Sequence, residues 1–116
     1  MRAVLCIGLA AFLFAGPARA TGWSPSAAWL RAATCVHLKE GPWHANTGNG
    51  YFGGFQFNAT TWKRVGGAPE PAFAHPGNPA YPFQASPREQ LYRAWILWQR
   101  DGRTWRSWGA IGSTCS

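Results

Sequence analysis

The residues of this chain that could do chemistry gather between positions 40 and 62. The stretch Asn46–Trp62 combines four glycines, which permit unusual backbone angles, with five large aromatic side chains. Gln56 and Thr61 add polar groups to the stretch, and Glu40 lies just upstream of it. Tight turns, flat faces and a few hydrogen-bonding groups beside one carboxylate indicate a site for a neutral, ring-shaped ligand such as a sugar.

A helix must carry Glu40 to this site. Ser24-Pro25 predicts its start, with serine as the N-cap and proline in the first turn, and Gly41-Pro42 predicts its end. One face carries four residues at steps of four, three and four: Trp29, Ala33, Val36 and Glu40. A carboxylate in the last turn, beside apolar neighbours, has a raised pKa, which suits a general acid. The alternative is a solvated glutamate at a frayed helix end.

The remaining elements are short and separated by turns. Residues 46–50 predict a turn, and residues 51–57 predict a short, irregular strand or hairpin. Asn58 predicts the cap of a short helix over 59–65. A capping box from Ser86 to Glu89 opens a second long helix, which Gly102 ends. The proline-rich segment 66–86 is a long loop that either walls a cleft or only links the two helices. This pattern predicts a mainly helical α+β fold.

The first twenty residues have the features of a secretory signal peptide. Arg2 precedes an apolar run from Ala3 to Ala15, and the segment ends in Ala18-Arg19-Ala20. The apolar run is about five residues too short to span a bilayer. We therefore expect cleavage after Ala20, with an uncleaved anchor as the alternative, and a single exported domain over residues 21–116.

The cysteines indicate one disulfide. Cys6 lies in the apolar part of the leader, which leaves Cys35 and Cys115 in an oxidising compartment. A bond between them closes a loop of about 80 residues, which contributes about 4.5 kcal/mol in the chain-entropy model. The three histidines of the chain show no zinc-site spacing with these cysteines, so we expect no metal and no cofactor.

The charge of the chain is positive, with 11 basic and four acidic residues. A positive exported protein favours polyanionic surroundings, such as nucleic acid, anionic lipid or a bacterial cell wall, unless the charge serves solubility alone. No nucleic-acid motif accompanies the basic residues. A cationic protein that acts on membranes is a weaker alternative, because no predicted helix has a strongly basic face.

The residues from Asn46 to Phe57, with Thr61-Trp62, resemble the core signature of the transglycosylase-like domain of resuscitation-promoting factors. That domain belongs to the lysozyme-like superfamily. A looser similarity extends the match to roughly residues 29–116, through Cys35, Arg88-Glu89-Gln90, Trp105, Trp108 and Cys115. The resemblance implies a small lysozyme-like domain with a short irregular β-hairpin and one disulfide.

The resemblance also implies a function and a site. The family binds peptidoglycan in a cleft and cuts the β-1,4 bond between N-acetylmuramic acid and N-acetylglucosamine. Its single catalytic glutamate ends the first helix close behind the first cysteine, and Glu40 fits that position. The substrate-binding residues that carry over are Asn46, Tyr51, Gln56, Thr61 and Trp62. The family's disulfide corresponds to Cys35–Cys115.

Three features depart from the family pattern. Four residues separate Glu40 from Cys35, and Gly41-Pro42 replaces a Ser-Gly-Gly or Ala-Gly-Gly turn, which affects the aim of the carboxylate. Asn58 stands where some members carry aspartate, which removes a helper charge. The loop over 68–80 is longer than in the compact members and alters the wall of the cleft.

The number of carboxylates narrows the chemistry. Glycoside hydrolysis ordinarily uses two carboxylates that flank the bond. Besides Glu40, residues 21–116 contain Glu70 in the proline-rich loop, Glu89 in a helix cap and Asp101 at a helix end. This predicts a lytic transglycosylase that uses one carboxylate. The alternatives are a muramidase that hydrolyses the same bond with Glu70, and a non-catalytic peptidoglycan-binding module in which Glu40 is idle.

These inferences also predict the partners and the location of the protein. We expect a secreted bacterial monomer, extracellular or associated with the cell wall, whose partner is the glycan strand of peptidoglycan. Another cell-wall hydrolase is a further expected partner. We expect no nucleic-acid partner and no membrane span within residues 21–116.

Overall fold

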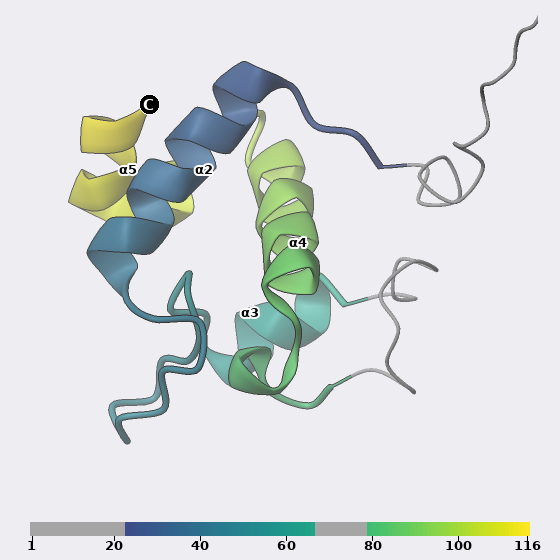
Figure 1. The fold of residues 1–116 in the computed structure, drawn as a ribbon, viewed down its shortest axis with the longest axis vertical. Helices are drawn as coiled ribbons and strands as arrows, with labels where there is room; N and C mark the ends of the chain where they lie inside the picture. The colour runs from purple at the N-terminus through teal and green to yellow at the C-terminus, as the bar shows by residue number, and fades with distance from the viewer. Residues whose placement is uncertain (1–22, 67–78) are drawn as a thin grey trace, which may run out of the picture.

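A computed structural model describes residues 23–66 and 79–116, which form a mainly helical domain. The helices in these ranges are α2 (Ala27–Glu40), α3 (Ala59–Arg64), α4 (Pro87–Arg100) and α5 (Gly109–Cys115). Two 3-10 turns accompany them, η2 (Pro82–Gln84) and η3 (Arg106–Trp108). α2 runs diagonally between α5 and α4, and α3 lies near the first turns of α4 (Figure 1). The predicted leader and residues 67–78 of the proline-rich loop, with Glu70, lie outside the described residues.

α2 carries Glu40 on its last turn, as predicted, but it begins two residues later than predicted. Ser26 is the N-cap, because its Oγ accepts a hydrogen bond of 3.0 Å from the N–H of Trp29. The prediction of Ser24 as the N-cap was wrong. Ser24 and Ser26 offer the same capping side chain, so residue type alone does not distinguish between them. The buried residues of the helix are the three apolar members of the predicted face, Trp29, Ala33 and Val36.

The glycine-rich segment after α2 forms a minimal hairpin. Isolated antiparallel bridges join Phe52 to Asn46 on one side and to Phe57 on the other. The described residues contain no strand longer than these bridges. Gly53 has a φ of +76°, and a Cβ at Gly54 would lie only 2.4 Å from the Trp43 ring. These two positions therefore require glycine, which confirms the irregular hairpin and explains why no regular sheet extends from it.

The caps of α3 and α4 follow the predictions. Asn58 Oδ1 accepts a hydrogen bond of 2.8 Å from the N–H of Thr61, and Ser86 Oγ accepts one of 3.1 Å from the N–H of Glu89. Glu89 also forms a buried ion pair with Arg93, one turn further along α4. Caps and local charge pairs depend on residues a few positions apart, which is why the sequence reveals them.

The C-terminal tail folds back onto α2. It contains η3 and α5, neither of which the tryptophan- and glycine-rich sequence predicted. A Cβ at Gly112 would lie 2.1 Å from the carbonyl oxygen of Trp105, so the turns of α5 pack against this tryptophan with no room for a side chain. Packing against Trp105 therefore stabilises a helix that its own glycines disfavour.

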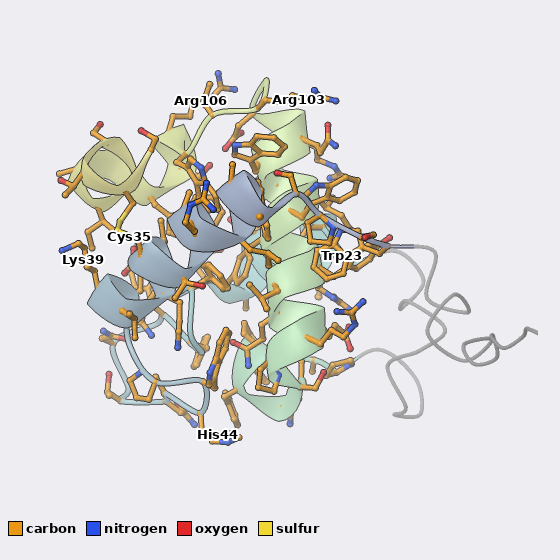
Figure 2. The ribbon with its side chains drawn as sticks, turned by 45° about the horizontal axis from the view of Figure 1, so that its top comes forward. Trp23, Cys35, Lys39, His44, Arg103 and Arg106 are labelled. Atoms are coloured by element: carbon orange, nitrogen blue, oxygen red, sulfur yellow. A yellow bond between two sulfur atoms is a disulfide. The ribbon has the colours of Figure 1, made fainter. Side chains whose placement is uncertain are left out.

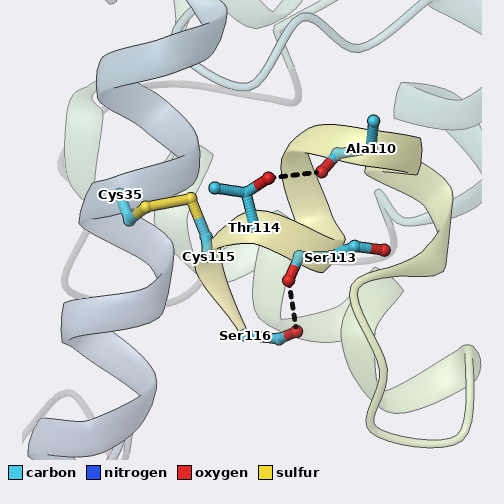
Figure 3. The surroundings of a disulfide bond; sticks show 6 residues. All are labelled: Cys35, Ala110, Ser113, Thr114, Cys115 and Ser116. Carbon is cyan, nitrogen blue, oxygen red and sulfur yellow. Dashed lines mark hydrogen bonds between the residues drawn. A yellow bond between two sulfur atoms is a disulfide. The ribbon is translucent and has the colours of Figure 1, made fainter.

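The predicted disulfide joins Cys35 in the middle of α2 to Cys115 at the end of α5, across a separation of 80 residues. Figure 3 shows the bond between the two helices, with the hydrogen bonds Thr114 to Ala110 and Ser116 to Ser113 in the last turns of α5. The disulfide and the packing of Gly112 together hold the C-terminal segment against α2.

The core of the domain is unusually aromatic. Its large buried aromatic residues are Trp23, Trp29, Phe55, Phe57, Trp62, Trp105 and Trp108. Trp105 stacks on Trp29 with ring centroids 5.5 Å apart, and this contact joins α2 to the tail. In the two described ranges, no helix is long and apolar enough to cross a membrane. The mainly helical fold, its trace of β-structure and its disulfide confirm the predicted class and are compatible with a small lysozyme-like domain.

Candidate active site

A cleft of about 490 Å³ lies where the end of α2 meets the hairpin, α3 and the C-terminal tail. It is large enough for a small-molecule ligand or a short stretch of a polymer. Four of the predicted site residues line it together: Glu40, Tyr51, Gln56 and Thr61. They come from three different segments of the chain, so the fold gathers into one cavity the groups that the sequence could only place near one another.

Glu40 is half-buried and lines this cleft. Its helix ends directly after it, where the N–H of Gly41 donates a hydrogen bond of 3.1 Å to the carbonyl oxygen of His37. Burial among its neighbours raises the pKa of the Glu40 carboxyl above the ordinary value of 4.5. A carboxyl group that keeps its proton closer to neutral pH can donate that proton to a ligand. The predicted direction of the shift is therefore confirmed, with desolvation as its cause.

Gln56 adopts an unusual backbone conformation beside Glu40. Its φ is +51°, a left-handed angle that costs a non-glycine residue about 1–2 kcal/mol. Its Nε2 donates a hydrogen bond of 3.0 Å to the carbonyl oxygen of Gly53 and lies 3.6 Å from a Cβ built at Gly41. The strained backbone thus holds the amide next to the residue that follows Glu40. Strain of this kind is a feature of functional sites.

The segment Gly41–Ala45 forms the hinge between Glu40 and the hairpin, and the buried side chain of Gln90 holds it in place. Its Oε1 accepts a hydrogen bond of 2.8 Å from the N–H of Gly54, and its Nε2 donates to the carbonyl oxygens of Trp43 at 3.0 Å and Ala85 at 3.1 Å. One side chain of α4 therefore ties the hinge, the hairpin and the turn before α4 together. We call these contacts the Gln90 clamp.

His37 strengthens the same region from α2. Its Nδ1 donates a hydrogen bond of 3.0 Å to the carbonyl oxygen of Gly54, and its ring stacks on Trp43 with centroids 3.7 Å apart. Gly54 is thus bonded through its N–H to α4 and through its carbonyl to α2. The hinge Gly41–Ala45 is short, and these contacts fix the path of the chain directly after Glu40 at the end of α2.

We expect Gln90→Met to lower the stability of the protein and, if the cleft cleaves peptidoglycan as the sequence predicts, to lower the rate of that cleavage as well. The change keeps the shape of the side chain but leaves up to three buried backbone groups without a partner, each at a cost of about 1–3 kcal/mol. Thermal unfolding and the kinetics of peptidoglycan cleavage measure the two effects. If Gln90 positions Glu40, kcat falls more than KM rises. Gln84→Met is the matched control, because it removes only an exposed hydrogen bond to the Tyr81 N–H, and equal kinetics for both variants would contradict the positioning role.

Two predicted binding residues do not line the cleft. Trp62 is only 1% exposed, its Nε1 donates to the carbonyl oxygen of Pro79 at 2.9 Å, and the Arg93 guanidinium lies 4.2 Å from its ring. A side chain buried in this way supports the cleft from behind and offers no face to a ligand. Asn46 is exposed at the bridge with Phe52 and also lies outside the lining of the cleft.

Sequence reasoning assigned no site role to several lining residues and missed the wall that the C-terminal tail supplies. The lining residues that it did not select for the site are Phe55, Phe57, Asn58, Leu97, Ser107, Trp108 and Gly109. Trp108 is held by a hydrogen bond of 3.0 Å from its Nε1 to the carbonyl oxygen of Phe55. The predicted disulfide was the available signal, because a tail tied to Cys35 must run close to the end of α2 that carries Glu40.

The other described carboxylates are engaged elsewhere. Glu89 is buried in its ion pair with Arg93. Asp101 accepts a hydrogen bond from the Ser107 hydroxyl and lies 3.6 Å from the Arg106 guanidinium. Glu40 is therefore the one acidic side chain among the described residues that line the cleft. Nor do the described residues bring three or more potential metal ligands together.

Comparison with known proteins identifies the family. The family model of the transglycosylase-like domain matches residues 24–111, and the chain therefore belongs to that family. The chain is 40% identical to resuscitation-promoting factor Rpf of Micrococcus luteus over 101 residues, which cover 87% of the chain and 37% of that protein. It is 36% identical to resuscitation-promoting factor Rpf1 of Corynebacterium glutamicum over 112 residues, which cover 95% of the chain and 49% of that protein.

A third relative matches a shorter part of the chain at higher identity. Resuscitation-promoting factor RpfC of Mycobacterium tuberculosis is 48% identical over 50 residues, which cover 43% of the chain and 34% of that protein. The resemblance to a resuscitation-promoting factor domain is thus confirmed. The chain spans less than half the length of each of these relatives.

Proposed function

We propose that residues 21–116 form an exported enzyme that cleaves the β-1,4 bond between N-acetylmuramic acid and N-acetylglucosamine in peptidoglycan. The observation that carries the proposal is the raised pKa of Glu40, the one carboxylate among the described residues of the cleft. The transglycosylase-like family and its resuscitation-promoting relatives support a lysozyme-like action on peptidoglycan. A lone acid in the cleft favours lytic transglycosylation over hydrolysis with two carboxylates.

In the proposed mechanism Glu40 acts first as an acid and then as a base. Its carboxyl proton passes to the glycosidic oxygen, and the bond from that oxygen to C1 of the muramic acid breaks. The 6-hydroxyl of the same muramic acid attacks C1, and its proton returns to the Glu40 carboxylate. The products are a 1,6-anhydro sugar and a strand with a free 4-hydroxyl, so no water is consumed and Glu40 is regenerated.

The other cleft residues have binding roles in this proposal. Gln56, Thr61 and Tyr51 would hold the N-acetyl and hydroxyl groups of the sugars. Tyr51 is 48% exposed, so its ring is available for stacking on a sugar face. Trp108, with its N–H fixed to Phe55, would support the opposite wall. Asn46, outside the lining, would at most contact a longer ligand at the rim.

The setting of the proposed enzyme follows from the predicted leader. Cleavage after Ala20 would export residues 21–116 to the cell surface, where the peptidoglycan strands lie. The positive charge of the chain would favour residence in an anionic cell wall. We expect a monomer that needs no cofactor, and another cell-wall hydrolase as a further partner.

Cleavage of purified peptidoglycan tests the proposal. The exported wild-type protein should release soluble fragments, whereas Glu40→Gln should release none above background. Glu70→Gln is the matched control, because Glu70 is the partner that hydrolysis with two carboxylates would need. Full activity of Glu70→Gln supports the one-carboxylate mechanism, and its loss supports the muramidase. Retention of both wild type and Glu40→Gln on peptidoglycan, without fragments from either, would support a binding module and contradict the enzyme.

The pH dependence of cleavage should report the pKa of Glu40. A general acid acts in its protonated form, so kcat/KM falls as the pH rises through the pKa of that acid in the free enzyme. Because burial raises this pKa above 4.5, the alkaline limb of the profile should lie above that value. Initial rates of fragment release over a series of buffers of constant ionic strength measure the limb. A limb at or below the ordinary glutamate value would contradict Glu40 as the acid.

A further inference from the structure

A second hollow lies outside the candidate active cleft, where the segment before α2 meets α4. It has a volume of about 370 Å³, and four tryptophans, Trp23, Trp29, Trp95 and Trp98, line it with Gln99 and Arg103. We call it the tryptophan groove. Figure 2 shows Trp23 and Arg103 on the α4 side of the molecule, well away from Cys35 and Lys39. No described residue lines both the groove and the candidate active cleft, so the groove is a separate feature of the surface.

The tryptophans of the groove form a fixed platform. Trp23 packs edge-on against Trp29 at 6.2 Å and against Trp95 at 6.3 Å between ring centroids. Arg88 holds Trp23 in place, because its guanidinium donates a hydrogen bond of 3.2 Å to the Trp23 carbonyl oxygen and lies 5.0 Å from the ring. Trp95 and Trp98 remain half-buried, so parts of their rings are open to a ligand.

The Trp29 indole adds a second, independent observation. This side chain is 5% exposed, and its Nε1–H has no hydrogen-bond acceptor in the part of the chain that the structure describes. A buried donor without an acceptor costs about 1–3 kcal/mol, and such donors in folded proteins are usually served by ordered water or a ligand. The donor belongs to a residue that lines the groove. The donor atom itself is covered in this conformation, so a polar ligand in the groove would relieve this cost after a small shift of the side chains that cover it.

The polar groups of the groove define the class of its ligand. Ser24 and Ser26 supply hydroxyls, Gln99 an amide and Arg103 a guanidinium, and no carboxylate is among the described lining residues. Hydroxyl and amide groups beside open tryptophan faces suit a sugar ring with N-acetyl substituents. A cationic ligand would meet the charge of Arg103 with no carboxylate to compensate it.

We propose that the tryptophan groove binds a stretch of N-acetylated glycan as a second site of the domain. The choice of a glycan rests on the proposed function, whereas the groove and its polar groups stand on their own. Trp29 and Glu40 lie about 16 Å apart along α2, so the groove is distinct from the cleft. Trp105 links the two sites, because it stacks on Trp29 at 5.5 Å and lies 5.1 Å from Trp108.

The two sites together would hold the protein on the cell wall. Binding at one site raises the effective concentration of glycan at the other, which strengthens retention on a polymer without strengthening either contact. Short oligomers can occupy the sites independently. They therefore allow the groove to be tested apart from cleavage.

The test follows the indole N–H signals of the protein by NMR, during titration with a short oligomer of N-acetylglucosamine. The full chain is produced in a secreting host with isotope-labelled tryptophan, and Trp29→Phe and Trp98→Phe assign two groove signals. Trp108, which lines the cleft, reports on that site within the same spectrum. We expect saturable shifts of the Trp29 and Trp98 signals in addition to any shift of Trp108.

A double variant, Gln99→Ala with Arg103→Ala, removes two polar groups of the groove, of which Gln99 is half-buried and Arg103 is exposed. It should lose the Trp29 and Trp98 shifts, whereas the exposed control Arg31→Ala should keep them. Shifts at Trp108 alone would overturn the proposal that the groove binds glycan and would leave the proposed function intact. No shift at any tryptophan would count against both. If the Trp29 and Trp98 shifts persist in the double variant, they reflect ligand binding in the cleft, transmitted through Trp105. This result would also overturn the proposal.

Discussion

Replacing Glu40 with glutamine is expected to lower the rate of peptidoglycan cleavage by about 100- to 10,000-fold, the usual contribution of a general acid. Glutamine keeps the size and polarity of the side chain but has no proton to give to the glycosidic oxygen. Because the cleft offers no other described carboxylate, no neighbour can replace it. Initial rates of fragment release from purified peptidoglycan measure the loss. Unchanged rates would show that Glu40 is idle.

The same variant should leave binding intact and make the fold slightly more stable at neutral pH. The raised pKa of Glu40 means that the folded state binds its proton more tightly than the unfolded state does. The resulting stabilisation is fully present below the ordinary pKa of 4.5 and is lost as the pH rises through the raised pKa. Glu40→Gln avoids the burial of a charge, so its melting temperature should exceed that of wild type at neutral pH and not below 4.5. Co-sedimentation with peptidoglycan checks binding.

Replacing both Cys35 and Cys115 with alanine is expected to destabilise the fold by about 2–5 kcal/mol, because the cross-link closes a long loop in the unfolded chain. In a domain of this size each kcal/mol corresponds to about 4–8 °C in melting temperature. The disulfide also holds the tail, with Ser107, Trp108 and Gly109 of the cleft wall, against the helix that carries Glu40. We therefore expect cleavage to weaken at temperatures where the variant is still folded.

Two comparisons separate stability from the shape of the cleft. Thermal unfolding of the double variant should match that of reduced wild type, whereas Thr114→Ala, next to Cys115, should behave almost as wild type. The kinetics are then measured well below the melting temperature of the variant. A melting temperature equal to that of oxidised wild type would contradict the stabilising role. Full activity would show that the wall keeps its place without the cross-link.

The local features of this domain could be predicted from the sequence. The face of α2, the Asn58 and Ser86 caps and the Pro87 start of α4 depend on residues a few positions apart. The disulfide was predictable for a different reason, because two cysteines outside a leader leave one pairing. Local spacing also placed Glu40 on the stripe that faces the interior, which is the cause of its raised pKa.

Features that depend on how segments of the chain pack in the fold could not be predicted. α5 contains Gly109 and Gly112, which disfavour a helix locally, and forms because Gly112 packs against Trp105. Trp62 has an aromatic side chain of the kind that stacks on sugar rings, but Arg93 and Pro79 enclose it in the fold. Gln90 belonged to the looser family similarity but had no role assigned to it, and only the fold brings its side chain to Gly54 and Trp43.

The Gln90 clamp answers the question that the sequence left open about the hinge. Gly41–Ala45 differs from the usual turn of the family and must still aim Glu40 into the cleft. In the fold, Trp43 is stacked on His37 and its carbonyl is bonded to Gln90, so the hinge is attached to both long helices. A hinge held from two sides can direct the carboxylate without the glycine pair of the family's turn.

Mass spectrometry of the cleavage products tests the central claim most directly. The exported protein digests purified peptidoglycan in water enriched in a heavy oxygen isotope, with Glu40→Gln as the blank. One-carboxylate lytic cleavage predicts 1,6-anhydro muropeptides, each one water lighter than the hydrolysis product and free of the heavy isotope. Reducing-end muropeptides that carry the heavy oxygen, released by wild type and absent from the blank, would contradict it.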